Sequence, residues 1–161
     1  MKIGILTDST CDLPEDILKK YEINVIPLNV SLDKKQYKDQ VDISSIDFFD
    51  KIKKSNQLPT TSQPSAGEFG KIYSKLDEKY DHILSIHLSK HLSGTIQSAK
   101  LALQNNPKLN VTIVDSKSAS MGLGFLVILA AKLLKSNYKL DEIVNKLKKA
   151  REETKVYLTV D

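Results

Sequence analysis

The stretch that decides the fold is Lys2-Ile3-Gly4-Ile5-Leu6-Thr7-Asp8-Ser9-Thr10. Its first part, up to Leu6, is a short apolar run, and its second part, from Thr7 onward, is polar. A short apolar run that stops abruptly at polar residues is typical of a buried strand in a parallel sheet. We therefore predict a first strand over residues 2–6, with a polar loop at its carboxyl end.

The same pattern continues along the chain, where strand signals alternate with helix signals. Further strands are predicted over residues 23–30, 83–87, 111–114 and 156–160, with a hairpin over residues 32–37. Helices are predicted after Asp12, Ser44, Ser65 and Ser93, and over residues 118–135 and 140–151. Strands that alternate with helices form right-handed crossovers, so we predict an α/β fold with three layers, α/β/α, around a mainly parallel sheet.

Length and charge narrow the class of protein. A chain of 161 residues, with 40% hydrophobic and 27% charged residues, suits one globular domain. The net charge is +4, but the lysines are scattered among acidic residues, and the chain has no tryptophan. Nucleic-acid surfaces need clustered basic side chains with aromatic rings between them. We therefore predict no nucleic-acid partner.

The compartment is indicated by what the sequence lacks. Cys11 is the only cysteine, so no internal disulfide can form and nothing indicates an oxidising compartment. The first residues become polar too quickly for a signal peptide. The longest uncharged run, residues 118–131, is shorter than the roughly 18 residues that a membrane span needs. We expect a cytoplasmic protein.

A hydroxyl-rich segment between two prolines, Leu58-Pro59-Thr60-Thr61-Ser62-Gln63-Pro64-Ser65, is a second notable feature. Each proline fixes its own φ and favours extended geometry in the residue before it, so we predict a rigid loop. Ser65 and Glu68 have the spacing of a capping box, which predicts a helix start at Ser65. The simplest interpretation is a rigid connection; the alternative is that the loop presents hydroxyl groups to a ligand.

Three predicted strands run into hydroxyl-rich loops, which follow residues 6, 87 and 114. In open α/β sheets, ligands bind beyond the carboxyl ends of the strands. Helix starts after Ser65 and Ser93 would place free amides beside these hydroxyls, an arrangement that binds anions. Gly94 fits this hypothesis, because a residue without Cβ lets a ligand approach the backbone. A carboxylate or a phosphate is the expected ligand.

Known catalytic signatures are absent. The sequence has no G-x-x-x-x-G-K-[ST], G-x-G-x-x-G or G-x-S-x-G motif. His87 and His91 have a metal-binding spacing only if helical, and no third ligand is evident, so we predict no metal. Asp8 and Asp115 either move a proton, hold Mg²⁺ or cap helices, and capping is the commoner role. Cys11 is either a nucleophile or a small packed residue, and no base is assigned to it.

The segment from Ser118 to Lys135 is apolar on nearly every side of its predicted helix. Such a helix is usually a central core element. The alternative is that one of its faces lines an apolar ligand cavity or meets another domain. Gly122 and Gly124 permit close packing under either interpretation.

Four segments together resemble the N-terminal half of the DegV family. They are Thr7-Asp8-Ser9-Thr10-Cys11-Asp12-Leu13-Pro14, Pro59-Thr60-Thr61-Ser62-Gln63-Pro64-Ser65, Leu92-Ser93-Gly94-Thr95 and Val114-Asp115-Ser116. The resemblance implies a Rossmann-like domain that belongs to a fatty-acid-binding subunit of a bacterial fatty acid kinase. Such a subunit holds one long-chain fatty acid and presents its carboxylate to a separate kinase.

The resemblance also implies roles for particular residues. Thr61 and Ser93 match the hydroxyl groups that hold the carboxylate, with Ser62 and Gly94 beside them. The binding protein is then not itself an enzyme, it has no catalytic residue, and it needs no cofactor and no metal. Its partners would be the fatty acid, the catalytic subunit of the kinase and, during lipid exchange, the surface of a membrane.

Members of the family are usually close to twice as long as this chain. We therefore expect residues 1–154 to form the N-terminal domain and residues 155–161 to be a strand that leads into a second domain absent from this chain. Without that half of the tunnel, the fragment should bind fatty acid weakly. The alternative function is an enzyme or sensor that binds a small phosphorylated or carboxylate metabolite at the same sheet edge.

Overall fold

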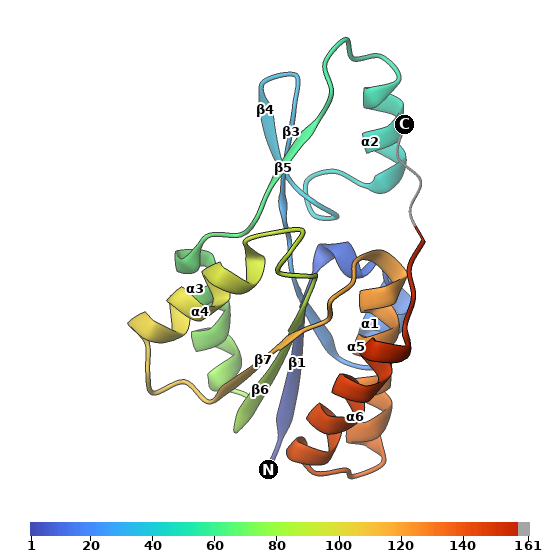
Figure 1. The fold of residues 1–161 in the computed structure, drawn as a ribbon. Coiled ribbons are helices and arrows are strands. Elements are labelled where there is room, and N and C mark those ends of the chain that lie inside the picture. Colours follow the sequence, from blue (N-terminus) through green and yellow to red (C-terminus); the bar gives the residue numbers. More distant parts are fainter. Residues whose placement is uncertain (158–161) are drawn as a thin grey trace.

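A computed structural model describes residues 1–157 and contains a four-stranded parallel sheet at its centre (Figure 1). The strand order is β2-β1-β6-β7, so the first strand of the sequence lies in the interior of the sheet. In the register, Ile5 pairs with Ile23 on one side and with Leu84 on the other. The strands are β1 (Ile3–Asp8), β2 (Ile23–Ile26), β6 (His82–His87) and β7 (Val111–Asp115).

Helices cover both faces of this sheet, which confirms the predicted three-layer α/β/α class. One face packs against α1 (Glu15–Lys20), α5 (Ser120–Lys135) and α6 (Leu140–Glu153). The other face packs against α3 (Ala66–Asp77) and α4 (Thr95–Asn105). Each face therefore has its own apolar core, and the strands between them are buried on both sides, as parallel strands usually are.

Helix α5 is the central helix of the larger core. Leu123, Val127 and Ala130 are completely buried, and the helix contacts α6, β1 and β6. Its apolar surface is not covered all round, because Phe125 remains 60% exposed. The core interpretation of this segment is therefore right for most of the helix. Of the residues that the structure describes, none lies in a helix long and apolar enough to cross a membrane.

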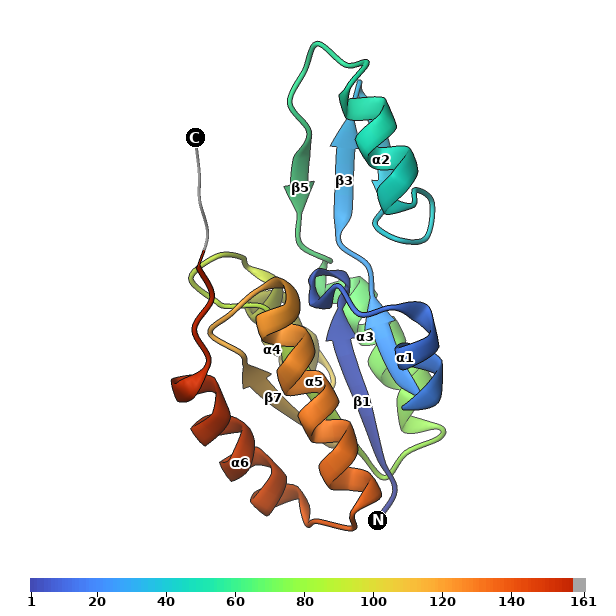
Figure 2. The same ribbon diagram turned by 90° about the vertical axis from the view of Figure 1, so that its right-hand side faces the viewer.

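A second, smaller sheet stands beyond the carboxyl edge of the parallel sheet (Figure 2). Its order is β4-β3-β5, and its strands are antiparallel. The predicted hairpin is present, with Asp33 and Lys34 at φ 49° and 64° in its turn. The elements of this part are β3 (Asn29–Leu32), β4 (Lys35–Lys38), α2 (Ser45–Ile52) and β5 (Thr60–Ser62).

The predicted single strand over residues 23–30 is wrong, because it is divided between the two sheets. β2 ends at Ile26, and Pro27 follows. Proline has no amide hydrogen to donate and therefore interrupts a strand ladder. The amide of Leu28 instead donates to Ser9 Oγ at 3.1 Å, and the chain continues into β3.

The predicted loop between Pro59 and Pro64 is also partly wrong, because its middle is strand β5. Thr61 pairs with Val30 of β3, and β-branched residues such as threonine favour strands. At the C-terminal side, the predicted strand over residues 156–160 is not present at Val156 or Tyr157, which lie in no regular element. The remainder of that prediction lies outside the described residues.

Helix starts were predictable where a side chain caps them. Ser65 accepts from Glu68 N, and Glu68 accepts from Ser65 N, so both halves of the capping box are present. Ser44 caps α2 as predicted. Asp12 does not cap α1: it has a left-handed φ of 50° and ends a short 3₁₀ turn, η1 (Ser9–Cys11), whereas Pro14 precedes the helix.

Two helical glycines provide a matched test of the packing. A Cβ on Gly124 of α5 would lie 2.5 Å from the backbone oxygen of Cys11, whereas a Cβ on Gly67 of α3 would meet nothing closer than 3.9 Å. We expect Gly124→Ala to lower the free energy of unfolding by about 1–3 kcal/mol, because the backbone at η1 must shift. Gly67→Ala should raise it by about 0.5–1 kcal/mol through helix propensity. Urea denaturation measures both, and equal effects of the two variants would contradict this packing.

Candidate functional site

The carboxyl ends of β1 and β6 are held together by the side chain of Asp8, which is completely buried. Asp8 Oδ1 accepts from Thr10 N at 3.1 Å and from Thr10 Oγ1 at 2.5 Å. Asp8 Oδ2 contacts His87 Nδ1 at 2.9 Å and accepts from Leu88 N at 3.0 Å. Burial raises the pKa of this carboxyl, but the hydrogen bonds from His87, Thr10 and Leu88 outweigh burial, and the net pKa is lowered.

A chain of polar contacts continues from His87 into the core below the carboxyl ends of the strands. His87 Nε2 lies 2.7 Å from Ser85 Oγ, which lies 2.8 Å from the hydroxyl of Tyr73. All three residues are completely buried. If Tyr73 donates to Ser85 and Ser85 donates to His87 Nε2, then His87 Nδ1 carries the hydrogen that Asp8 accepts, and every donor is used.

These contacts decide the roles left open for the acidic residues and histidines. Asp8 accepts from Thr10 N as the cap of η1, and Asp115 accepts from Lys117 N at 2.9 Å. Both aspartates therefore build turns. The two ring nitrogens of His87 are occupied, and His91 lies exposed in the following loop. Among residues 1–157, no group of three His, Cys, Asp or Glu could hold a metal ion.

Most hydroxyl groups along this edge are used to shape their own loops. Ser9 Oγ accepts from Leu28 N, Ser89 Oγ accepts from His91 N at 3.3 Å, and Ser116 Oγ donates to Ser118 O at 3.0 Å. Such local bonds stabilise turns. These serines are therefore poor candidates for ligand binding, although the sequence pattern did not separate them from the others.

Ser93, just before α4, has a hydroxyl proton available for a ligand. Its Oγ accepts from Thr95 N at 3.3 Å and lies 2.9 Å from Thr95 Oγ1. Thr95 is completely buried, so its hydroxyl must donate to a partner, and Ser93 Oγ is the one within reach. Ser93 then accepts two hydrogen bonds and keeps its own proton to donate. Gly94 follows and is the residue directly before α4.

Thr61 and Ser62 lie on opposite faces of the small sheet. Thr61 is the cross-strand partner of Val30, and Ser62 is that of Asn29. Neighbouring residues of a strand point to opposite faces, so only one of the two hydroxyls faces a given ligand. Asn29 Nδ2 approaches Ser62 Oγ at 3.4 Å, whereas the side chain of Thr61 is exposed and its hydroxyl hydrogen-bonds no other residue that the structure describes. Thr61 is therefore the better ligand candidate.

The two hydroxyl-bearing segments meet at Gln63 and Gly94. A Cβ built on Gly94 would lie 2.7 Å from Gln63 Nε2, so the Gln63 amide rests against the backbone of the loop before α4. This contact brings the end of β5, which carries Thr61 and Ser62, beside Ser93. Sequence reasoning missed Gln63, and its position directly after the hydroxyl run was the only signal.

Comparison with known proteins identifies the family. The family model described as "Uncharacterised protein, DegV family" matches residues 2–161. The chain belongs to the DegV family. This confirms the resemblance seen in the four sequence segments.

Three relatives show how far the similarity extends. A DegV domain-containing protein of Listeria monocytogenes is 39% identical over 161 residues, which cover 99% of this chain and 57% of that protein. A solved structure on fatty acid binding by a DegV family protein from Thermus thermophilus has a TM-score of 0.87 and 41% identity, covering 94% of this chain and 54% of that chain. DegV from Bacillus subtilis, described as a fatty acid binding protein, has a TM-score of 0.89 and 34% identity, with the same coverage. The chain thus spans little more than half the length of these relatives.

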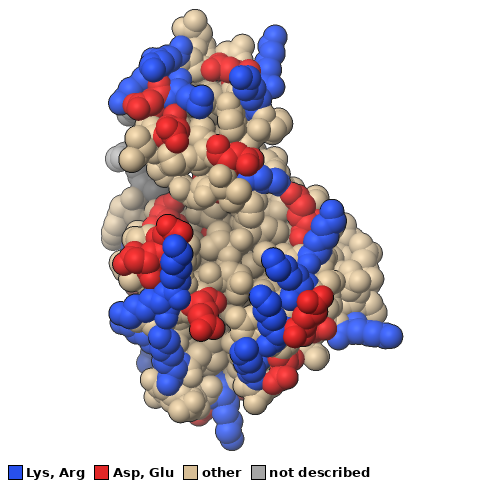
Figure 3. Space-filling model, turned by 180° about the vertical axis from the view of Figure 1, so that it is seen from behind, with Lys and Arg blue, Asp and Glu red and all other residues tan. Residues whose placement is uncertain are grey.

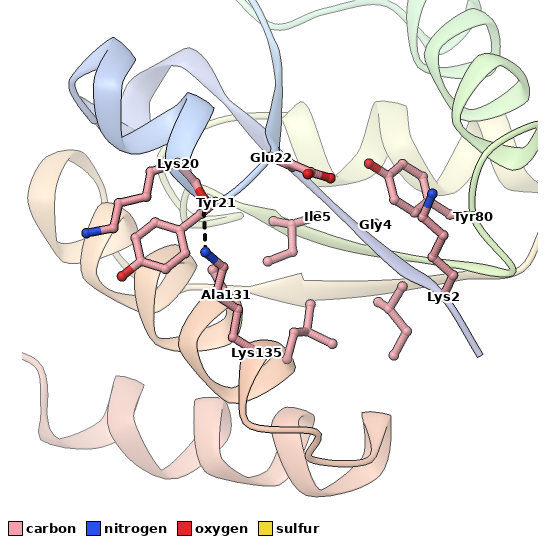
Figure 4. A pocket seen from close by; sticks show the side chains of 11 residues that line it. Lys2, Gly4, Ile5, Lys20, Tyr21, Glu22, Tyr80, Ala131 and Lys135 are labelled. Atoms are coloured by element: carbon pink, nitrogen blue, oxygen red, sulfur yellow. Dashed lines mark hydrogen bonds between the residues drawn. The ribbon is translucent and has the colours of Figure 1, made fainter.

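A cavity of about 300 Å³ lies at the opposite end of the sheet in this DegV-family chain (Figure 4). Its lining includes Lys2, Lys20 and Lys135, and the rings of Tyr21 and Tyr80. Lys135 Nζ donates to Lys20 O at 3.0 Å and lies 4.6 Å from the centre of the Tyr21 ring. Because α1 and α5 end here and helix C-termini carry partial negative charge, these lysines neutralise the helix ends. We assign no anion to this cavity.

Surface charge and the cysteine give no second site. On the face shown in Figure 3, acidic and basic side chains are interspersed. Cys11 is buried, and burial raises the pKa of its thiol to about 11. A thiol with that pKa is protonated at neutral pH and is a poor nucleophile, so the packing interpretation of Cys11 is the right one.

Replacing Asp8 by Asn tests whether this carboxylate holds the sheet edge. The Asn amide group would face Leu88 N or the donors of Thr10, so a buried donor would meet another donor. We expect Asp8→Asn to lower the free energy of unfolding by about 3 kcal/mol in urea denaturation at pH 7. The control is Asp12→Asn, an exposed aspartate four residues away, which should change it by less than about 0.5 kcal/mol.

The pH dependence of the free energy of unfolding, compared between the wild type and Asp8→Asn, provides a second test. The pKa of Asp8 is lower in the folded state than in the unfolded state, where it is about 3.9. Asp8 therefore contributes fully to the free energy of unfolding above the unfolded pKa, and this contribution is lost as the pH falls through the folded pKa. The difference between the wild type and Asp8→Asn should therefore shrink below a pH of about 4. A difference that stays constant from pH 7 to acid would contradict the role assigned to Asp8.

Proposed function

We propose that this chain binds the carboxylate of a long-chain fatty acid between the end of β5 and the loop before α4. The observation that carries the proposal is Ser93, whose Oγ accepts from Thr95 N and lies 2.9 Å from the buried Thr95 hydroxyl, an arrangement that leaves the Ser93 proton free when Thr95 is the donor. The relatives from Thermus thermophilus and Bacillus subtilis are described as binding fatty acids, which supports a lipid ligand here.

The proposed ligand groups come from both segments. Ser93 and Thr61 donate hydroxyl hydrogens to the carboxylate, and the first amides of α4, beside Gly94, face it. The first amides of a helix have no internal partner and carry partial positive charge, which favours an anion. The Ser62 hydroxyl is not among the proposed ligand groups, because it points to the opposite face from Thr61 and Asn29 already approaches it.

The two ends of the ligand contribute differently to its affinity. Burying an acyl chain yields about 0.8 kcal/mol per CH₂, so a long chain contributes on the order of ten kcal/mol before the costs of binding. A hydrogen bond to a charged carboxylate contributes only about 1.5–3 kcal/mol. The hydroxyls therefore fix the position of the head group, and the tail supplies most of the affinity.

In the whole protein, we propose that the bound carboxylate is presented to a separate kinase, which forms the acyl phosphate. The chain itself is not the catalyst under this proposal. In support, the buried Asp8 and His87 are fully engaged with each other and with their neighbours, so neither is free to act as a base. Peripheral contact with a membrane during lipid exchange belongs to the same proposal.

The 161 residues alone should bind fatty acid weakly. Thr61 and Ser62 are exposed, and the relatives are nearly twice as long, so we propose that further protein completes the enclosure of the tail. We expect a dissociation constant above the micromolar range for palmitate in a calorimetric titration of this chain. Sub-micromolar binding would contradict this part of the proposal.

Substitution of the two hydroxyls tests the carboxylate site. Thr61→Val and Ser93→Ala should each weaken palmitate binding by about 10-fold or more, because each removes a hydrogen bond to a charged group. Thr60→Val is the matched control: it also lies in β5 but points to the opposite face from Thr61. Unchanged affinity in both test variants, or an equal loss in the control, would remove these residues from the site.

Extraction of the purified protein separates the proposal from its main alternative. Because the 161 residues alone should hold the ligand weakly, the extract is made from the whole protein, and mass spectrometry of it should return a fatty acid. Recovery of a small phosphorylated or carboxylate metabolite in its place would favour an enzyme or sensor that uses the same sheet edge.

A further inference from the structure

We propose that Gln63 is a positioning residue, which holds the end of β5 against the loop before α4 so that Thr61 and Ser93 reach the same carboxylate. This inference rests on the proposed fatty-acid site and assigns a role to a residue that touches neither hydroxyl. We call the contact of the Gln63 side chain with Gly94 the Gln63 latch.

The geometry of Gly94 provides the first argument. Its φ of −77° and ψ of 6° are available to any residue, so the backbone does not require glycine here. A Cβ would lie 2.7 Å from Gln63 Nε2 and 3.1 Å from Gln63 Cδ, so the exposed Gln63 side chain would have to leave its place against Gly94. The missing side chain of Gly94 is therefore the seat of the Gln63 amide.

The main chain of Gln63 is anchored on its other side. Asn29 Nδ2 donates to Gln63 O at 3.3 Å, and Asn29 Oδ1 accepts from Lys38 Nζ at 2.5 Å. Because Lys38 can only donate, it fixes which end of the Asn29 amide faces Gln63. Lys38 also pairs with Glu68 of α3, and its hydrogen bond lowers the pKa of Glu68 to about 2. The pair is thus ionised at neutral pH and ties β3 and β4 to α3.

The residues after Gln63 are equally constrained. Pro64 is buried and fixes its own φ, and Ser65 is held in the capping box of α3. The backbone around Gln63 is therefore fixed from both directions. Its side chain is the part that crosses to Gly94, which lies one residue from Ser93.

This arrangement explains why a carboxylate suits the site. Two hydroxyls on separate segments bind two oxygens of one head group more tightly when their separation is fixed in advance, because less ordering is then needed on binding. Asn29, Lys38 and Glu68 fix one segment, Thr95 fixes the other, and the Gln63 latch joins the two. Removing the latch should leave both hydroxyls present but poorly aligned.

The contact itself is tested in solution by NMR. The side-chain amide hydrogens of Gln63 should show a nuclear Overhauser effect to the α-hydrogens of Gly94 in the 161-residue chain. The effect should be lost in Gly94→Ala, whose methyl group takes the seat. Absence of the effect in the wild type would overturn the latch, whether or not the chain binds palmitate.

A double-mutant cycle then tests its role in binding. Gln63→Ala and Gly94→Ala should each weaken palmitate binding by about 5-fold, near the loss of one ordinary polar contact. The double variant should be no weaker than either single variant, because both changes remove the same contact. Gln104→Ala, at the far end of α4, is the control and should bind like the wild type.

The outcomes separate this inference from the proposed function. Additive losses in the double variant would show that Gly94 acts on the ligand directly, and would overturn the positioning role. If the wild type binds no palmitate at all, the proposed function fails, and the nuclear Overhauser effect alone decides whether the latch exists. Circular dichroism should show that all four variants are folded, because none of the substituted positions has a positive φ.

Discussion

The arrangement of the loops at the carboxyl edge of the parallel sheet depends on one buried carboxylate. Asp8 ends β1, and four donor groups from Thr10, His87 and Leu88 surround its oxygens. A buried charge is stable only when its hydrogen-bonding capacity is filled, so the loops after β1 and β6 cannot separate without a large cost. The loop after β6 leads to Ser93, and the position of that hydroxyl therefore depends on Asp8.

The two sheets contribute differently to the candidate site. The parallel sheet is a rigid base, because its strands are buried between two apolar cores and α5 packs against η1 through Gly124. The small antiparallel sheet carries Thr61 above that base and is tied to it through Asn29, Lys38 and Glu68. In the proposed site, the parallel sheet fixes the position of Ser93, and the smaller sheet places Thr61 opposite it.

Local signals in the sequence predicted much of this fold. The capping box at Ser65 and the apolar run of α5 act within a few residues, so the pattern alone reveals them. The contact between Asp8 and His87 joins residues 79 apart, and no local pattern indicates it. The opposite orientations of Thr61 and Ser62 follow from the pairing of β5 with β3, and that pairing was hidden because the prolines indicated a loop. The sequence thus indicated the region of the candidate site, but not the contacts within it.

The proposed site lies at the carboxyl edge of the parallel sheet and not at the cavity beside Tyr21 and Lys135. The most direct measurement is a ¹H–¹⁵N correlation spectrum of the labelled chain during addition of palmitate. The amide signals of Thr61, Ser93 and Gly94 should shift together, while those of Tyr21 and Lys135 beside the opposite cavity stay in place. Shifts confined to Tyr21 and Lys135, with the edge unchanged, would contradict this proposal.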